Sequence, residues 1–443
     1  MKNIITTLVA TLGLSLVATS ATNNVKFQAE LSHPLIPADK KHLSYLKVSV
    51  IGGEAPEATD RAPINIAIVL DQSGSMSGQK IADAREAAKM AVARLQNNDT
   101  VSIVTYSSNV NVLVPSTKLN DKKAVYEAID SITTGGSTAL FAGVSKGAEE
   151  IRKFKQADAI NRILLLSDGR ANSGPQTPKE LGDLGASLSR EGISVTTIGL
   201  GNGYNEDLMN QLALNSDGNH SFVETPGELA QVFKQELGDL LSVVAQDLTL
   251  EVKLADGVRP VRSLGRDADI TKQTVSLKLN QLYAKQEKFL LLEVETPTLE
   301  SNNDLLIADA SLTYRNLKSE EKVTAQTRSV ARITSDQVQL ESSINREVMI
   351  TAVDFIANDK NELAIQLRDE GKVKEAQVLL LGNQTYLENQ ASLWNSRKLA
   401  EEAALNCHDA HQVDTANWGD KRKAMTQRSN SKVTQNSGYR SKN

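Results

Sequence analysis

The chain has 443 residues, 40% of them hydrophobic and 23% charged, which is the composition of a folded protein with two or three domains. Aromatic residues make up 4% and the formal net charge is −5, so neither a stacking surface nor a strongly basic one is expected and a nucleic-acid partner is disfavoured. Cys407 is the only cysteine, which excludes an intramolecular disulfide.

Residues 1–21 have the pattern of a secretory signal. Lys2 precedes an apolar stretch from Ile4 to Ala18, and a small residue follows at Ala21, where a signal peptidase could cut. The stretch is shorter than the roughly 20 residues that span a bilayer, and no other segment of the sequence is long and apolar enough to cross a membrane. We therefore expect an exported bacterial protein, periplasmic or extracellular, without a transmembrane segment in its mature form. A buried first helix and an uncleaved anchor are the alternatives.

Two separate parts of the chain show the alternating pattern of half-solvated strands. Residues 22–60 contain two such segments, and residues 244–335 contain several more with no helical segment between them. This arrangement predicts one β-sandwich built from both parts. The intervening residues, 61–243, would then be inserted into the sandwich.

The inserted part alternates between strands and helices. Continuous apolar runs occur at 64–70, 100–106, 162–166 and 193–200, and the segments between them carry apolar residues on one helical face. The pattern predicts an α/β domain with a doubly wound, mostly parallel sheet. Only a hairpin fits between 100–106 and the next apolar run, so we expect one antiparallel edge strand.

The last part of the chain changes character twice. Residues 336–410 have a helical period interrupted near Gly371, which predicts a helical hairpin. Residues 411–443 are polar, with seven Lys and Arg residues against two Asp, and we predict a disordered basic tail there.

Polar residues follow three of the predicted strand or loop ends in the α/β domain. Asp71, Ser73 and Ser75 lie in "DQSGSM", Thr138 lies in "GGSTAL", and Asp168 lies in "LLLSDG". Ligands of doubly wound sheets bind at the carboxyl ends of the strands, so these five side chains should gather on one rim. Taken singly, the first motif also fits a helix cap and the third a simple turn.

An all-oxygen set of two carboxylates and three hydroxyls selects a hard cation. Mg²⁺ is expected, with Mn²⁺ and Ca²⁺ as alternatives. Because hydroxyls are neutral ligands, the ion would remain short of negative charge. It would then accept a carboxylate from outside the chain.

The three motifs, in this order, resemble the metal-ion-dependent adhesion site of von Willebrand factor type A domains. The similarity continues to about residue 240, and "GVRPVRSLG" and "FLLLEVETP" further along resemble secreted bacterial members of the calcium-activated chloride channel and inter-alpha-trypsin inhibitor group. The resemblance implies five metal-site residues: Asp71, Ser73, Ser75, Thr138 and Asp168. It also implies that Thr138 is recruited when an external carboxylate arrives.

Two other motifs lack parts that their chemistry requires. "GLGNG" at 199–203 has Tyr204 where a dinucleotide-binding loop needs its third glycine. "NCHDAH" at 406–411 has too few ligands for zinc and lacks the second cysteine of a haem attachment site. Neither motif predicts a site.

The sequence therefore predicts an exported, metal-dependent, adhesion-type module that binds an Asp or Glu side chain of a partner protein, and not an enzyme. One alternative is an assembly or maturation factor for a cell-envelope complex. Another is a metal-assisted hydrolase that uses a metal-bound water, against which stands the lack of a general base other than the ligands themselves. The sequence indicates neither the partner nor the oligomeric state.

Overall fold

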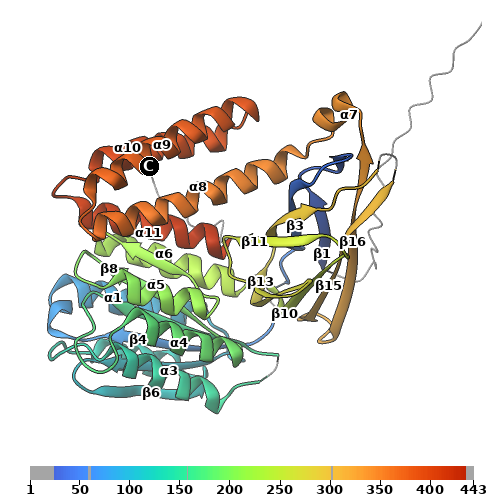
Figure 1. Ribbon diagram of the computed structural model, residues 1–443. Coiled ribbons are helices and arrows are strands. Elements are labelled where there is room, and N and C mark those ends of the chain that lie inside the picture. Colours follow the sequence, from blue (N-terminus) through green and yellow to red (C-terminus); the bar gives the residue numbers. More distant parts are fainter. Residues whose placement is uncertain (1–23, 58–60, 157, 301–302, 436–443) are drawn as a thin grey trace, which may run out of the picture.

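The computed structural model describes residues 24–57, 61–156, 158–300 and 303–435. The signal predicted for residues 1–21 lies outside these ranges. Figure 1 shows three parts: an α/β domain at the lower left, a β-sandwich at the right, and a group of long helices above the α/β domain. The predicted fold class, an α/β domain inserted in a β-sandwich and followed by a helical region, is confirmed.

The α/β domain is built on a six-stranded sheet with the order β6-β5-β4-β7-β8-β9. All neighbours pair in parallel except β5 and β6, which form the expected antiparallel hairpin. Every residue of β4 and of β7 is buried, as the continuous apolar runs predict for strands covered on both faces. The strands are β4 (Ile64–Asp71), β5 (Thr100–Tyr106), β6 (Val110–Lys118), β7 (Ile160–Ser167), β8 (Ile193–Leu200) and β9 (His220–Val223).

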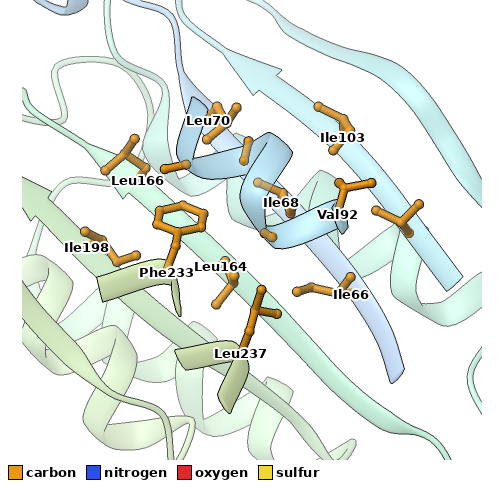
Figure 2. Packing of buried hydrophobic residues seen from close by; sticks show 14 of the residues in the cluster. Ile66, Ile68, Leu70, Val92, Ile103, Leu164, Leu166, Ile198, Phe233 and Leu237 are labelled. Carbon is orange, nitrogen blue, oxygen red and sulfur yellow. The ribbon is translucent and has the colours of Figure 1, made fainter. Parts of the chain in front are cut away.

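Helices cover both faces of this sheet. α1 (Gln79–Arg94), α2 (Lys122–Asp130) and α6 (Pro226–Leu240) share one hydrophobic core with it, and α3 (Leu140–Lys153), α4 (Pro178–Arg190) and α5 (Glu206–Asn215) share the other. Figure 2 shows Phe233 and Leu237 of α6 packed against Ile68 and Leu164 of the sheet. Burying side chains of this size contributes roughly 1.5–3 kcal/mol each.

The β-sandwich joins strands from before and after the α/β domain. Its two sheets have the orders β1-β3-β14-β11 and β12-β13-β10-β15-β16-β2. β3 pairs with β1 on one side and with β14 on the other, and β2 pairs in parallel with β16, so the expected pairing across the insertion is observed. The strands are β1 (Val25–Leu31), β2 (Leu35–Pro37), β3 (His42–Gly52), β10 (Val243–Leu254), β11 (Arg259–Leu264), β12 (Asp269–Thr271), β13 (Thr274–Tyr283), β14 (Glu287–Thr296), β15 (Asp304–Asn316) and β16 (Lys322–Thr334).

The helical region is larger than the predicted hairpin. α8 and α9 form that hairpin, and Gly371 between them has φ 82°, a left-handed conformation that favours glycine at a helix end. α10 packs on α9, and α11 lies between α8 and the α/β domain (Figure 1). The helices are α7 (Gln337–Ser342), α8 (Arg346–Asp369), α9 (Val373–Leu393), α10 (Arg397–Gln412) and α11 (Trp418–Thr434). In the described part of the chain, none of the helices has both the length and the apolar character needed to cross a membrane.

The prediction that residues 411–443 form a disordered tail is wrong for the part that is described, up to residue 435. α11 occupies most of it, and Lys423 and Met425 are buried. The charge pattern predicts solvated basic residues, whereas Arg422 and Lys423 form ion pairs with Glu206 at the start of α5. More than 200 residues separate these partners in the chain. The charge pattern of the tail alone therefore could not reveal them.

Candidate metal centre

The two carboxylates lie at the ends of adjacent parallel strands. Asp71 is the last residue of β4, and Asp168 follows directly after β7. Because β4 and β7 pair in parallel, their carboxyl ends meet at the same edge of the sheet. A short 3₁₀ turn, Gly74–Met76, follows β4 and places Ser73 and Ser75 beside both.

The Asp71 carboxylate is buried and held on both oxygens. The backbone N–H of Ser73 donates to Oδ1 at 2.8 Å, and the hydroxyl of Ser167 donates to Oδ2 at 2.7 Å. Burial raises the pKa of Asp71 above its ordinary value, and these hydrogen bonds oppose only part of that rise. The negative charge of Asp168 nearby raises it further. A cation on this rim would relieve the penalty that burial imposes on the ionised form.

Ser73, Ser75 and Asp168 form a continuous row of oxygen atoms. The hydroxyl oxygens of Ser73 and Ser75 are 3.0 Å apart, and Ser75 Oγ donates to Asp168 Oδ1 at 2.6 Å. Neighbouring oxygens around an octahedral Mg²⁺ lie about 3 Å apart, because each metal–oxygen distance is about 2.1 Å. The donor types and their spacing therefore fit a hard cation.

Thr138 reaches the same rim from the loop before α3. Its backbone N–H donates to Asn172 Oδ1 at 2.7 Å, and the N–H of Asn172 donates back to the Thr138 carbonyl at 3.1 Å. Gly135 and Gly136 tie this loop to the turn after β4 through hydrogen bonds with Gln72 and Gly74. The five residues singled out in the sequence thus lie at the end of β4 and the turn after it, in the loop before α3, and in the loop after β7, and these segments are hydrogen-bonded to one another.

Gly169 keeps the space between two of these loops open. A Cβ atom at this position would lie 3.3 Å from Ser75 Oγ and 3.3 Å from Thr138 Oγ1. The two hydroxyls therefore face one small volume, which any side chain at position 169 would begin to fill. A side chain at position 169 would crowd both hydroxyls.

Two residues at the rim were not singled out from the sequence. Asn172 clamps the Thr138 loop, as described above, and Lys80 on α1 donates through Nζ to Asp168 Oδ2. Asn172 lies in the polar loop that follows Asp168, and Lys80 lies in the first helical turn after the serines. Proximity in the chain was the only available signal, and it applies equally to many other residues.

Besides its hydroxyls and two carboxylates, the rim holds the Lys80 ammonium and the Asn172 amide. Over the described ranges, no three or more His, Cys, Asp or Glu side chains group in a way that could hold a metal ion, so any cation here depends on serine and threonine oxygens. The "NCHDAH" segment lies on α10, where His411 Nδ1 contacts the carbonyl of Cys407 in its own helix. The hydroxyl and carboxylate oxygens at the rim are donor types that suit a hard cation.

Known proteins resemble this α/β domain. The family model described as von Willebrand factor type A domain matches residues 65–235. An uncharacterized protein of Synechocystis is 28% identical over 254 residues, covering 55% of this chain and 60% of the relative. The inter-alpha-trypsin inhibitor heavy chain H3 of Rattus norvegicus is 27% identical over 223 residues, covering 48% and 25%. The chain therefore spans less than two thirds of the length of either relative.

The likeness in fold extends beyond the α/β domain. A solved structure of a von Willebrand factor type A protein from Catenulispora acidiphila superimposes with a TM-score of 0.67 at 16% identity. The match covers 87% of this chain and 91% of that one. The sandwich and the helical region therefore belong to an arrangement that also occurs elsewhere.

Proposed function

Because residues 65–235 form a von Willebrand factor type A domain, we propose that this chain is an exported protein-binding module whose rim holds a divalent cation. Such domains are generally interaction modules, and they often depend on a bound metal. We propose Mg²⁺ as the cation and the five rim residues as the site that holds it: Asp71, Ser73, Ser75, Thr138 and Asp168. The partner is a protein that presents an Asp or Glu carboxylate.

The row of oxygens from Asp168 through Ser75 to Ser73 is the observation that carries this proposal. Only two carboxylates stand at the rim, and Asp71 already accepts hydrogen bonds on both of its oxygens. A divalent ion held mainly by hydroxyls keeps positive charge to share with an external carboxylate. When bound, the cation supplies the positive charge that the partner recognises, and the α/β domain holds the cation in a fixed position.

The first test measures metal binding to the full mature chain by titration calorimetry. Asp71→Ala and Asp168→Ala should abolish or strongly weaken Mg²⁺ and Mn²⁺ binding. Asp183→Ala is the matched control, because this carboxylate is exposed on α4 and pairs only with Lys179. Equal metal affinity in all four proteins would contradict the assignment of the site.

The second test concerns the partner. Cell-envelope proteins captured by the wild type should be lost in Asp71→Ala and in excess chelator, and retained by Asp183→Ala. Capture that persists in chelator would place the binding surface elsewhere on the molecule.

Export is tested separately, by amino-terminal sequencing of the protein isolated from cells. A mature chain that starts near Thr22 is expected. An intact Met1 on cytoplasmic material would contradict export without affecting the metal site.

A further inference from the structure

Lys80 lies where a lysine does not help its own helix. It is the second residue of α1, so its charge is close to the positive end of the helix dipole. The helix has no acidic residue in its first turn, and its N-cap, Gly78, offers no side-chain acceptor. A residue that is unfavourable for its own helix is expected where its side chain has a role in a binding site.

The side chain of Lys80 reaches Asp168. Its ammonium donates to Oδ2, while Ser75 donates to Oδ1, so both oxygens of this carboxylate are engaged. The Asp168 side chain is 0% exposed, and that of Lys80 is 36% exposed. A buried carboxylate requires a counter-charge, and in this arrangement Lys80 provides it.

The exposure of Lys80 gives its ammonium a route into water. Lysine has a flexible four-carbon stem and a compact, strongly hydrated charge, so it can leave the carboxylate by rotating its own side chain. A divalent ion that approaches Asp168 would repel the ammonium and compete with it for the same oxygens.

We propose that Lys80 is a tethered cation that competes with the divalent ion for Asp168 and thereby sets the metal affinity of the rim. It neutralises Asp168 while no ion is bound and moves to solvent when one binds. This inference rests on the proposed metal-binding function. Its consequence is that the wild-type rim binds metal more weakly than its oxygen ligands alone would allow, since only the fraction of molecules with Lys80 displaced can accept the ion.

The test compares three full-length variants. Lys80→Met removes the charge and keeps much of the stem, and Lys80→Arg keeps the charge. Lys89→Met is the matched control, because Lys89 lies on the same helix but pairs at the surface with Glu86 and Asp130. Titration calorimetry with Mg²⁺ and with Mn²⁺ gives the affinities, and thermal unfolding in chelator gives the metal-free stability.

Lys80→Met should bind either ion about threefold to tenfold more tightly than the wild type, and Lys89→Met should match the wild type. In chelator, Lys80→Met should unfold at a lower temperature, and saturating metal should remove that difference. Lys80→Arg should stay close to the wild type in both measurements. If Lys80→Met does not fold in chelator, Lys80→Gln replaces it, because its amide can still donate to Asp168 without competing as a charge.

Metal affinity that is unchanged or weaker in both neutral variants would overturn the role of Lys80. The proposed function would then still stand, provided that the wild type binds metal and Asp71→Ala does not. Metal binding that appears only when Lys80 is neutralised would support the inference most strongly. No metal binding in any variant, including the neutral ones, would overturn both.

Discussion

Two lysine–carboxylate pairs, one within the α/β domain and one between α11 and that domain, have the same chemistry and different surroundings. Lys80 pairs with Asp168 at the rim and is 36% exposed, whereas Lys423 of α11 pairs with Glu206 and is 5% exposed. Lys423 also donates to the Tyr204 carbonyl at 3.1 Å and lies 4.4 Å from the centre of the Tyr204 ring. From these exposures we expect the first cation to be able to leave its partner for solvent and the second to remain paired. Burial of the cation therefore separates an exchangeable pair from a structural one.

Contacts through Tyr204 and Gly203 also connect the two ion pairs. Tyr204 follows the loop that contains Gly203, and a Cβ atom on Gly203 would lie 2.6 Å from the carbonyl oxygen of Asp168. Lys423 thus supports, through Tyr204, the loop that packs against the backbone of a rim residue. The helix α11 is thereby linked to the rim through Tyr204 and Gly203.

The largest expected effect comes from breaking the buried pair. Lys423→Met should lower the free energy of unfolding by about 3 kcal/mol, because Glu206, whose side chain is largely buried, loses one of its two cationic partners. Urea unfolding of the full chain measures this. Lys179→Met is the control, since its pair with Asp183 is exposed and should contribute less than about 0.5 kcal/mol. A loss below about 1 kcal/mol for Lys423→Met would contradict the distinction drawn between the two pairs.

A third buried carboxylate extends the comparison to acid pH. Asp217, in the turn before β9, accepts from Arg266 at 2.9 Å and from Lys288 at 3.1 Å, both in the sandwich. Burial by itself would raise the pKa of Asp217, but the charges of Lys288 and Arg266 outweigh it and lower the pKa to about 2. A depressed carboxylate pKa stabilises the fold above the unfolded value of 3.8, and that stability is lost as the pH falls through about 2.

The contribution of Asp217 should be about 2 kcal/mol at pH 6, from the difference between its folded and unfolded pKa values. Asp217→Asn should therefore be less stable than the wild type at pH 6, and the difference should shrink steadily between pH 4 and pH 2. Urea unfolding across this range provides the measurement. A difference that does not depend on pH would show that the ion pairs are not its source.

Thr138→Ala should affect the two kinds of binding at the rim unequally. Thr138 is a neutral group on a separate loop, so its loss should change metal affinity by less than about threefold, since no carboxylate is removed. Capture of the partner should fall by about tenfold if Thr138 completes the site when an external carboxylate arrives. Calorimetry and capture on the same protein preparation would reveal the split. Equal losses in both would place Thr138 among the permanent ligands.

Asn172→Ala should weaken partner capture more than metal binding, as Thr138→Ala does, but to a smaller extent. It removes one hydrogen bond to the Thr138 backbone, worth about 1 kcal/mol, and leaves every proposed ligand in place. Partner capture should weaken by about fivefold or less, and metal affinity should change little. A larger loss than that of Thr138→Ala would mean that Asn172 acts on the partner directly.

The smallest expected effect is that of salt on the two lysines. In chelator, the stability difference between the wild type and Lys80→Met should shrink by a few tenths of a kcal/mol between about 0.05 M and 0.5 M NaCl, because a partly exposed pair is screened. The difference between the wild type and Lys423→Met should not change measurably. Identical salt responses would indicate that both pairs have the same access to solvent.

Local sequence patterns predicted the structure correctly where interacting residues are close in the chain, and also where the order of the strands brings distant residues together. Gly371 illustrates the first case: it lies between α8 and α9, where the helical period of the sequence is interrupted. Asp71 and Asp168 illustrate the second, since a doubly wound sheet brings the ends of its parallel strands together. The split sandwich was predictable for a similar reason, because two strands before the insertion require pairing partners after it.

The sequence by itself determined the α/β domain, the sandwich around it and the five polar residues that meet at the rim, because periodicity and strand order are properties of the chain. Only the tertiary structure decided the roles of Lys80, Asn172 and α11. A lysine in a first helical turn or in a basic tail has the same local pattern whether it is solvated or paired. Its partner is chosen by packing: Asp168 lies 88 positions from Lys80, and Glu206 lies 217 positions from Lys423. The burial of each lysine then determines whether its ammonium group can leave the carboxylate for solvent.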